Sequence, residues 1–420
     1  MPCRDAGRFF FKKGWQMSSI RIIAPKAYGS FTDSIDTGSL SRAFPSAETA
    51  DFVLFPGFCD VHVHFREPGF SYKETRYSGS RAAARGGYTA VCTMPNLDPV
   101  PDSEESISIE KFIIDRDAAI NVYPYGSITV GEAGRELSDM YGLRHLAVAF
   151  SDDGHGVQDG DVMMKAMEKA AALGTLIASH CEVNALLNGG YINQGAYSAA
   201  HGHKGISSES EWKEVERNIE LSDKTGCALH LCHMSTKESV QMIRQAKKQG
   251  IDVTAETAPH YLLLTEDDLQ EDGAWKMNPP LRTKKDREAL IEGIRDGTID
   301  IIATDHAPHT AREKARGLRD SAFGVSGIEI AFPLCYTGLV KTGIISLDRL
   351  MELLIVNPRS RFGIPLNRGD WCLWDLADEY SIDPGEFISM GKSTPFSGKK
   401  VYGRCLMTSC GGNEVYRYLK

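Results

Sequence analysis

At positions 53–69 the chain reads VLFPGFCDVHVHFREPG. Its first nine residues are mostly apolar and typical of a buried strand, and His62, His64 and Arg66 follow at alternate positions. Alternate side chains of an extended strand point the same way, so these three share one face. Three cationic or cationisable groups in a row repel one another unless a metal ion or a carboxylate lies opposite. The stretch therefore favours a metal site at a strand end, with an ordinary solvated strand face as the alternative.

Further candidate ligands follow other apolar runs, where each predicted strand ends. His180, His233 and Asp305 each close such a run, and the acidic pair Asp152-Asp153 comes just after another. Taken singly, each is no more than a polar residue where a strand meets its loop. Together they are imidazole and carboxylate ligands, which suit divalent zinc.

Strand-like and helix-like patterns alternate through the middle of the chain. Strands are predicted at 58–64, 88–94, 120–126, 146–151, 175–181, 227–233, 251–256 and 299–305. Helical patterns lie between them, such as those at 78–86, 160–173, 208–225, 236–250 and 284–296. Several helices end at glycine, as helix C-termini prefer. Eight parallel strands with helical crossovers predict an α/β fold, a (β/α)8 TIM-like barrel over 57–364. Its chemistry is expected at the C-terminal ends of the strands.

The two ends of the chain have a different pattern. Residues 17–56 and 365–420 are short strand-like pieces separated by turn residues, and together they predict a small β-domain beside the barrel. Residues 1–16 precede a more ordinary start at Met17, and we expect an extension or a disordered arm there.

Composition limits the classes of function. The chain has 420 residues, 42% of them hydrophobic, which is enough for one barrel-sized domain and an accessory. Its net charge of −9 has no long run of either sign, which argues against nucleic acid as a partner. The N-terminal residues offer no signal peptide or membrane span. Ten scattered cysteines without a CxxC pair favour a reducing, cytoplasmic location.

Several motifs, in order, resemble a known family. They are Asp60–Gly69, Met94-Pro95-Asn96, Ser151-Asp152-Asp153-Gly154, Met277–Arg282 and Ala303–His309, with Gly391–Phe396 at the tail. This set is similar to the dihydroorotases of the amidohydrolase superfamily, and within them to the class I bacterial form. The resemblance covers about residues 53–365. It implies a zinc-dependent cyclic amide hydrolase with a metal-dependent hydrolase barrel.

The resemblance implies a metal centre with two zinc ions. One zinc would be held by His62, His64 and Asp305, and the other by His180 and His233. A carboxylate would bridge them, and spacing to His180 favours Asp153 over Asp152. Many superfamily members bridge with a carbamylated lysine instead, but residues 150–154 contain no lysine, which supports the aspartate-bridged subtype.

The implied reaction is the reversible cyclisation of N-carbamoyl-L-aspartate to L-dihydroorotate in pyrimidine (UMP) biosynthesis, through a zinc-activated hydroxide. Asp305 would be both ligand and catalytic proton relay. Arg66 offers a planar fork for the substrate carboxylate. The resemblance adds further substrate contacts, namely His64, Asn96, Asn278, His309 and the backbone of Phe323-Gly324. The alternative for Asn96 and Asn278 is turn chemistry, and for His309 loop capping.

Other readings remain open from the sequence. Allantoinases and dihydropyrimidinases share the barrel, but they generally lack the arginine and use the lysine bridge. A non-catalytic dihydroorotase-like subunit would have lost metal ligands, and none is lost here. The resemblance also leaves room for a homodimer and for association with aspartate transcarbamoylase. Residues 310–322 are polar and predict a mobile lid, or else an ordinary exposed loop, and His201 and His203 are expected to be solvated.

Overall fold

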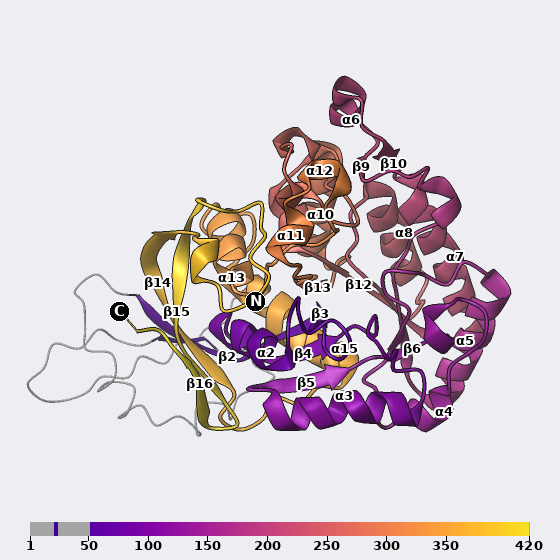
Figure 1. Cartoon of the computed structure of the whole chain (residues 1–420), viewed down its shortest axis with the longest axis horizontal. Coiled ribbons are helices and arrows are strands. Elements are labelled where there is room, and N and C mark those ends of the chain that lie inside the picture. Colours follow the sequence, from indigo (N-terminus) through magenta and orange to yellow (C-terminus); the bar gives the residue numbers. More distant parts are fainter. Residues whose placement is uncertain (1–20, 24–50, 420) are drawn as a thin grey trace, which may run out of the picture.

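The computed structural model describes residues 21–23 and 51–419 (Figure 1). Parallel strands form its centre. One sheet has the order β3-β4-β5 and a second the order β13-β12-β11-β8-β7-β6. Their bounds are β3 Phe58–Val63, β4 Tyr88–Thr93, β5 Asn121–Pro124, β6 Gly126–Ser127, β7 Phe150–Ser151, β8 Leu176–Ser179, β11 Ala228–Leu231, β12 Val253–Thr257 and β13 Ile301–Ile302. The eight predicted strands are all present, most of them shorter than predicted.

The two sheets meet at both of their edges. Tyr125, between β5 and β6, donates its backbone N–H to the carbonyl of Thr93 at 3.0 Å. At the other edge, Val63 pairs in parallel with His306, and the N–H of His64 donates to the carbonyl of His306 at 2.9 Å. The last strand of the series thus continues beside the first. Every residue of β3 and β4 is buried, as expected of parallel strands that are covered on both faces.

Helices surround these strands in Figure 1. The long ones are α2 Arg76–Arg85, α3 Glu104–Asp117, α5 Gly160–Leu173, α7 Glu209–Thr225, α8 Lys237–Lys248 and α10 Lys284–Asp296. Side-chain caps such as Thr75, Ser103 and Thr283 begin them, and left-handed glycines end α5, α7 and α10. Helix α3 is not among the helical patterns named from the sequence. Two of its apolar side chains, Ile109 and Phe112, are exposed and weaken its pattern.

Shorter elements connect the main ones. They are α4 Met140–Leu143, β9 Ile192–Asn193, α6 Ala196–His201, β10 Gly205–Ile206, α9 Pro259–Leu263, α11 Ala311–Lys314, α12 Gly317–Asp320, α13 Ala331–Cys335, α14 Leu347–Met351 and α15 Asn357–Phe362. In the described ranges no helix is both long and apolar enough to cross a membrane.

Segments from both ends of the chain share one sheet. Its order is β1-β2-β14-β15-β16, with bounds β1 Arg21–Ile22, β2 Phe52–Pro56, β14 Trp371–Ser381, β15 Lys400–Cys410 and β16 Asn413–Arg417. The sheet packs on the strand region through aromatic rings: Phe58 stacks on Phe332 at 5.3 Å and on Trp374 at 5.9 Å between centroids. The predicted arm 1–16 and most of the N-terminal flank lie outside the described residues.

Candidate metal centre and active site

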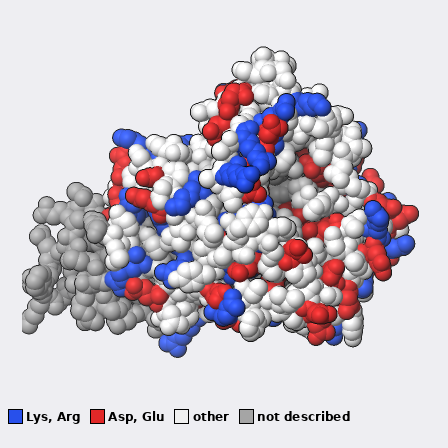
Figure 2. All heavy atoms as spheres, viewed as in Figure 1, with Lys and Arg blue, Asp and Glu red and all other residues white. Residues whose placement is uncertain are grey.

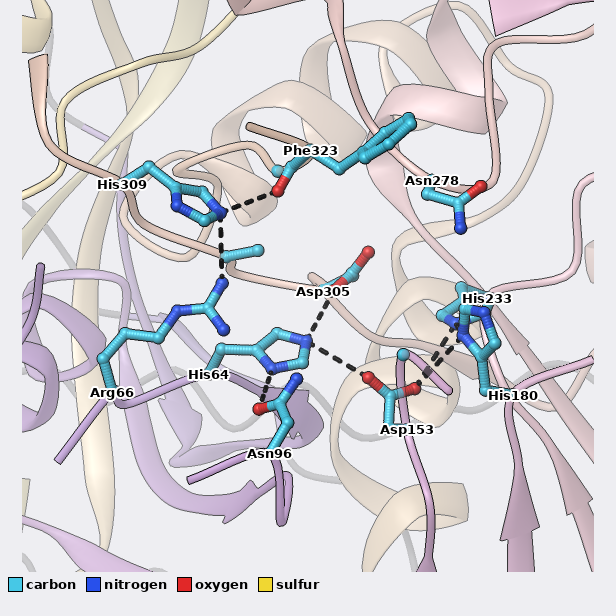
Figure 3. A pocket seen from close by; sticks show the side chains of 13 residues that line it. His64, Arg66, Asn96, Asp153, His180, His233, Asn278, Asp305, His309 and Phe323 are labelled. Atoms are coloured by element: carbon cyan, nitrogen blue, oxygen red, sulfur yellow. Dashed lines mark hydrogen bonds and ion pairs between the residues drawn. The ribbon is translucent and has the colours of Figure 1, made fainter. Parts of the chain in front are cut away.

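The C-terminal ends of the parallel strands bring the predicted ligands together, and Figure 3 shows all of them except His62. His62 lies on β3 and His64 directly after it, while Asp153, His180, His233 and Asp305 follow β7, β8, β11 and β13. All six side chains are buried. Residues that are up to 243 positions apart in the sequence thus come together in one cluster, because parallel strands end at the same edge.

Asp153 lies between two pairs of histidines. Its Oδ1 is 3.4 Å from His62 Nε2 and 3.5 Å from both His180 Nδ1 and His233 Nε2, and its Oδ2 is 3.5 Å from His64 Nε2. The ligand atoms of His62, His64 and Asp153 lie within 4.8 Å of one another, and so do those of Asp153, His180 and His233. One carboxylate is therefore shared by two potential metal sites.

Asp305 completes the first of these groups. Its Oδ1 is 3.2 Å from His64 Nε2 and 3.6 Å from His62 Nε2. Both Asp305 and His233 have left-handed backbone conformations, with φ of 46° and 41°. Such conformations are uncommon for residues other than glycine, and they persist where the surrounding structure imposes them, often at functional sites.

The donor set fits a divalent metal. His62 Nε2 and Asp153 Oδ1, which lie 3.4 Å apart inside the cluster, are buried and have no hydrogen-bond partner. Buried polar atoms without partners are costly, and a cation would satisfy them. Imidazole nitrogens with carboxylate oxygens are the ligand types that zinc takes in catalytic sites.

The charges in this cluster are strongly coupled. Burial would raise the pKa of Asp153, but His62, His180 and His233 hold it well below its usual range. Burial would lower the pKa of His62, but the carboxylates of Asp153 and Glu256 raise it well above its ordinary value. Metal ligands have to be deprotonated, so metal binding at this cluster would be coupled to proton release.

Asp152, the neighbour of Asp153, has a structural environment. It accepts hydrogen bonds from the backbone N–H of Ile128 at 2.7 Å and of Thr129 at 3.1 Å, and also from the Thr129 hydroxyl. These contacts turn its carboxylate away from the histidines. Of the acidic pair, Asp153 is thus the residue inside the cluster.

Sequence reasoning missed a buried pair behind the ligands, Glu256 and His230. Glu256 Oε1 accepts from His62 Nδ1 at 2.6 Å and from the backbone N–H of His233 at 3.2 Å, and its Oε2 lies 3.2 Å from His230 Nε2. His230 Nδ1 lies 2.9 Å from the Thr254 hydroxyl. One carboxylate thus sets the His62 tautomer, leaves Nε2 free for a metal and holds the His233 backbone. The only sequence signal was an acidic residue inside an otherwise buried strand.

Replacing Glu256 by glutamine is expected to lower metal affinity about 10–100-fold, the usual effect of losing a partner that orients a metal-binding histidine. Metal per chain after dialysis against graded chelator concentrations measures the effect. The matched control is Glu110→Gln, which removes another buried carboxylate that pairs with Arg76, outside the cluster. Equal metal retention in Glu256→Gln and wild type would contradict the assignment.

The metal cluster opens into a cavity of about 230 Å³. Besides the ligands, its walls include Arg66, Asn96, Asn278, His309 and the Phe323-Gly324 segment. The structure thus brings all the predicted substrate contacts to one cavity. Asn278 donates its amide to the carboxylate of Glu182 at 2.9 Å, so part of its hydrogen-bonding capacity is used within the protein.

Arg66 is the buried cation of this cavity. Its Nε lies 3.4 Å from the carbonyl of Pro308, and within the described ranges no carboxylate forms an ion pair with it. Burial lowers the pKa of Arg66 to about 10, and the nearby carboxylate of Asp305 opposes this shift. A buried guanidinium without an anion is costly, so the cavity favours an anionic ligand.

His309 is held as a neutral ring beside Arg66. Its Nδ1 lies 3.3 Å from the Lys73 ammonium and must accept, while Nε2–H donates to the carbonyl of Phe323 at 2.7 Å. Burial and the charges of Arg66 and Lys73 lower the pKa of His309 to about 3. The Arg66 guanidinium lies 3.4 Å from His309 Nε2, but both groups are donors and form no hydrogen bond in this tautomer. The guanidinium N–H groups therefore remain available to a ligand.

Asn96 contacts a candidate metal-binding histidine and also faces the cavity. Its Oδ1 accepts from His64 Nδ1 at 3.0 Å, which leaves the His64 Nε2 directed at Asp153 and Asp305. The Asn96 amide group remains as a donor at the cavity wall. The alternative of simple turn chemistry does not account for this contact with a metal-site histidine.

The predicted lid, residues 310–322, is folded as α11 and α12. Figure 2 shows basic side chains beside a hollow on this face of the molecule. Whether the segment closes over a ligand stays a prediction. The expectation that His201 and His203 are both solvated is wrong for His203, which contacts the Tyr191 hydroxyl at 2.7 Å and Glu271 at 2.8 Å.

Comparisons with known proteins agree with this geometry. Residues 52–239 match the family model "Dihydro-orotase-like". The chain is 50% identical to the dihydroorotase of Bacillus cytotoxicus over 386 residues, which cover 89% of this chain and 90% of that protein. It is also 50% identical to the dihydroorotase of Bacillus cereus (strain AH820), covering 87% of each chain.

Solved structures with the same fold include two cyclic amidohydrolases. The L-hydantoinase (dihydropyrimidinase) from Arthrobacter aurescens has a TM-score of 0.78 and 25% identity, covering 88% of this chain and 86% of that one. The dihydropyrimidinase from Brevibacillus agri has a TM-score of 0.74 and 21% identity, covering 89% and 88%. The higher identity, over nearly the whole length, is with the dihydroorotases. This chain therefore belongs to the dihydroorotase family.

Proposed function

We propose that this site interconverts N-carbamoyl-L-aspartate and L-dihydroorotate with two zinc ions and the residues named above. Dihydroorotase activity, a step of pyrimidine biosynthesis, is the function of the chain's relatives at 50% identity. The residue assignment rests on the presence of two features in one cavity. These are a carboxylate shared by two histidine pairs and a buried guanidinium without an anionic partner.

The resemblance and the distances support one set of metal ligands. His62, His64 and Asp305 would hold one zinc, and His180 and His233 the other, with Asp153 shared. A bound zinc lowers the pKa of a coordinated water and polarises a carbonyl oxygen. The unpartnered buried atoms His62 Nε2 and Asp153 Oδ1 support this set.

The remaining residues bind the substrate and move its proton. Arg66 and the amide of Asn96 bind and orient the substrate carboxylate, and His64 lies beside them. In the hydrolytic direction, water adds to the ring carbonyl carbon and the C–N bond breaks. Asp305 takes a proton from the water and delivers it to the departing ring nitrogen. In the biosynthetic direction the same transfers run backwards and water leaves.

Replacing Asp153 by alanine is expected to lower both metal content and turnover, because both histidine pairs lose their shared carboxylate. Asp152→Asn is the matched control, since an amide oxygen can still accept from the amides of Ile128 and Thr129. Metal per chain and initial rates measure both variants. Equal zinc in wild type and Asp153→Ala would rule out the shared position.

The strand arrangement supports a closed (β/α)8 barrel over 57–364, because β13 and β3 continue beside each other and Tyr125 links the two sheets. The mixed sheet of β1, β2 and β14–β16 supports a small β-domain built from both chain ends. Resemblance to the class I bacterial enzymes supports a cytoplasmic homodimer and association with aspartate transcarbamoylase. Sedimentation of the chain with and without that enzyme tests both associations.

One experiment tests the function directly. Zinc per chain is measured together with ultraviolet assays of dihydroorotate, allantoin and dihydrouracil. We expect about two zinc ions and turnover of dihydroorotate far above that of the other two. Preference for allantoin or dihydrouracil would favour the allantoinase or dihydropyrimidinase alternative. A fully metallated chain inactive on all three would favour a non-catalytic subunit.

A further inference from the structure

A buried lysine in the segment 310–322 makes three hydrogen bonds and no ion pair. Lys314, at the end of α11, is 6% exposed. Its ammonium donates to the carbonyls of Ala322 and Gly324 at 2.8 Å each, and to that of Lys276 at 3.1 Å. These bonds use all three of its N–H donors. Among the described residues no carboxylate lies within ion-pair distance of it.

Such a position is expensive for a charged side chain. Burial and the neighbouring Lys276 ammonium together lower the pKa of Lys314 to about 7, with Asp272 opposing them. Lys247 offers a contrast, because its ammonium binds the carbonyl of Gly297 and also the carboxylate of Asp300. The carbonyl contacts of Lys314 are thus its only direct polar partners among the described residues.

The carbonyls that Lys314 binds flank the cavity wall. Ala322 and Gly324 lie on either side of Phe323, whose own carbonyl accepts instead from His309 at 2.7 Å (Figure 3). The Gly324 N–H donates to the carbonyl of Lys276 at 3.0 Å. Two side chains, Lys314 and His309, therefore fix the directions of the backbone carbonyls in this wall.

The contacts of Lys314 determine the direction of the Phe323 N–H. In a trans peptide the C=O and N–H bonds are antiparallel. Because the Ala322 carbonyl is directed at Lys314, the N–H of Phe323 in the same peptide is directed away from it. Within the described ranges this N–H donates to no protein acceptor, and Phe323 lines the cavity.

We infer that Lys314 is a positioning residue for substrate binding, which turns the Ala322–Phe323 peptide so that the Phe323 N–H donates to an oxygen of the bound substrate. This inference rests on the proposed function for the nature of that substrate. Lys314 itself touches neither substrate nor metal. Its loss should weaken binding and leave the metal centre intact.

The test compares Lys314→Met, which keeps the length of the side chain without its donors, with Lys314→Arg, which keeps donors and charge. We expect KM for dihydroorotate to rise about tenfold in Lys314→Met, the loss of roughly 1.4 kcal/mol of binding. Turnover number and zinc content should stay near wild type, and Lys314→Arg should recover part of the change. Lys247→Met, far from the cavity, is the matched control and should leave KM unchanged.

A second measurement uses trypsin, which cleaves after the exposed Arg316 and Arg319. If Lys314 no longer holds the segment, trypsin should cleave after Arg316 and Arg319 faster in Lys314→Met than in wild type or Lys247→Met. Faster cleavage with an unchanged KM would make Lys314 a structural clamp and overturn the positioning role. An unchanged KM with unchanged cleavage in Lys314→Met would also overturn the positioning role. A rise in KM that Lys247→Met reproduces would overturn it as well. A wild-type chain inactive on dihydroorotate would sink the proposed function instead, and the cleavage rates would still decide whether Lys314 holds this wall.

Discussion

Asp305→Asn is expected to lower turnover about a hundredfold or more, while the chain keeps its fold and the metal bound by His180 and His233. Asp305 lies on the cavity wall with Oδ1 3.2 Å from His64 Nε2, where it can be both ligand and proton carrier. An amide oxygen still coordinates weakly, but an amide does not titrate. The ring nitrogen would have to depart unprotonated, and loss of general acid–base catalysis has this magnitude.

Asparagine is the right replacement for a structural reason as well. Asp305 has a φ of 46°, and asparagine is among the few residues that adopt this conformation readily. Alanine would add backbone strain to the loss of the carboxylate. Single-turnover rates at measured zinc content separate catalysis from metal loss. Near-wild-type turnover in fully metallated Asp305→Asn would leave this residue as a ligand alone.

Arg66→Met is expected to remove roughly 2–5 kcal/mol of transition-state stabilisation for dihydroorotate, the scale for truncating one partner of a buried charge pair. Methionine keeps most of the length of the side chain and removes the charge that, in the cavity, has no protein carboxylate as a partner. Arg66→Lys should recover only part of the loss, because an ammonium lacks the planar fork. The ratio of kcat/KM values for each variant measures the effect.

Dihydrouracil provides the control for Arg66, because it lacks the carboxylate that the guanidinium would bind. It should be a poor substrate for both wild type and Arg66→Met, so discrimination between the two compounds should fall in the variant. An Arg66→Met enzyme that still discriminates strongly would place the carboxylate pocket elsewhere.

Local patterns in the sequence were enough for most of the elements. Apolar runs of strand length, alternating with amphipathic stretches that end at glycine, predicted the strands and five of the long helices. This worked because hydrophobic periodicity and C-terminal glycines are local signals. Strand ends were predicted too long, since β7 and β13 are only two residues each and ladder pairing depends on neighbouring strands. Exposed Ile109 and Phe112 hid α3, because apolar residues on its solvent face weaken the helical pattern.

By itself, the sequence determined which ligand types stand at the strand ends and that an arginine accompanies them. Only the tertiary structure decided which groups meet. It places Asp153, which the sequence already favoured over Asp152, among the histidines, and Glu256 behind His62 across 194 positions of sequence. It also directs a lysine in a polar loop inward, onto three carbonyls of the cavity wall. The physical reason is that a residue's type sets the contacts it can make, whereas a buried polar group is satisfied by partners that folding brings from distant parts of the chain.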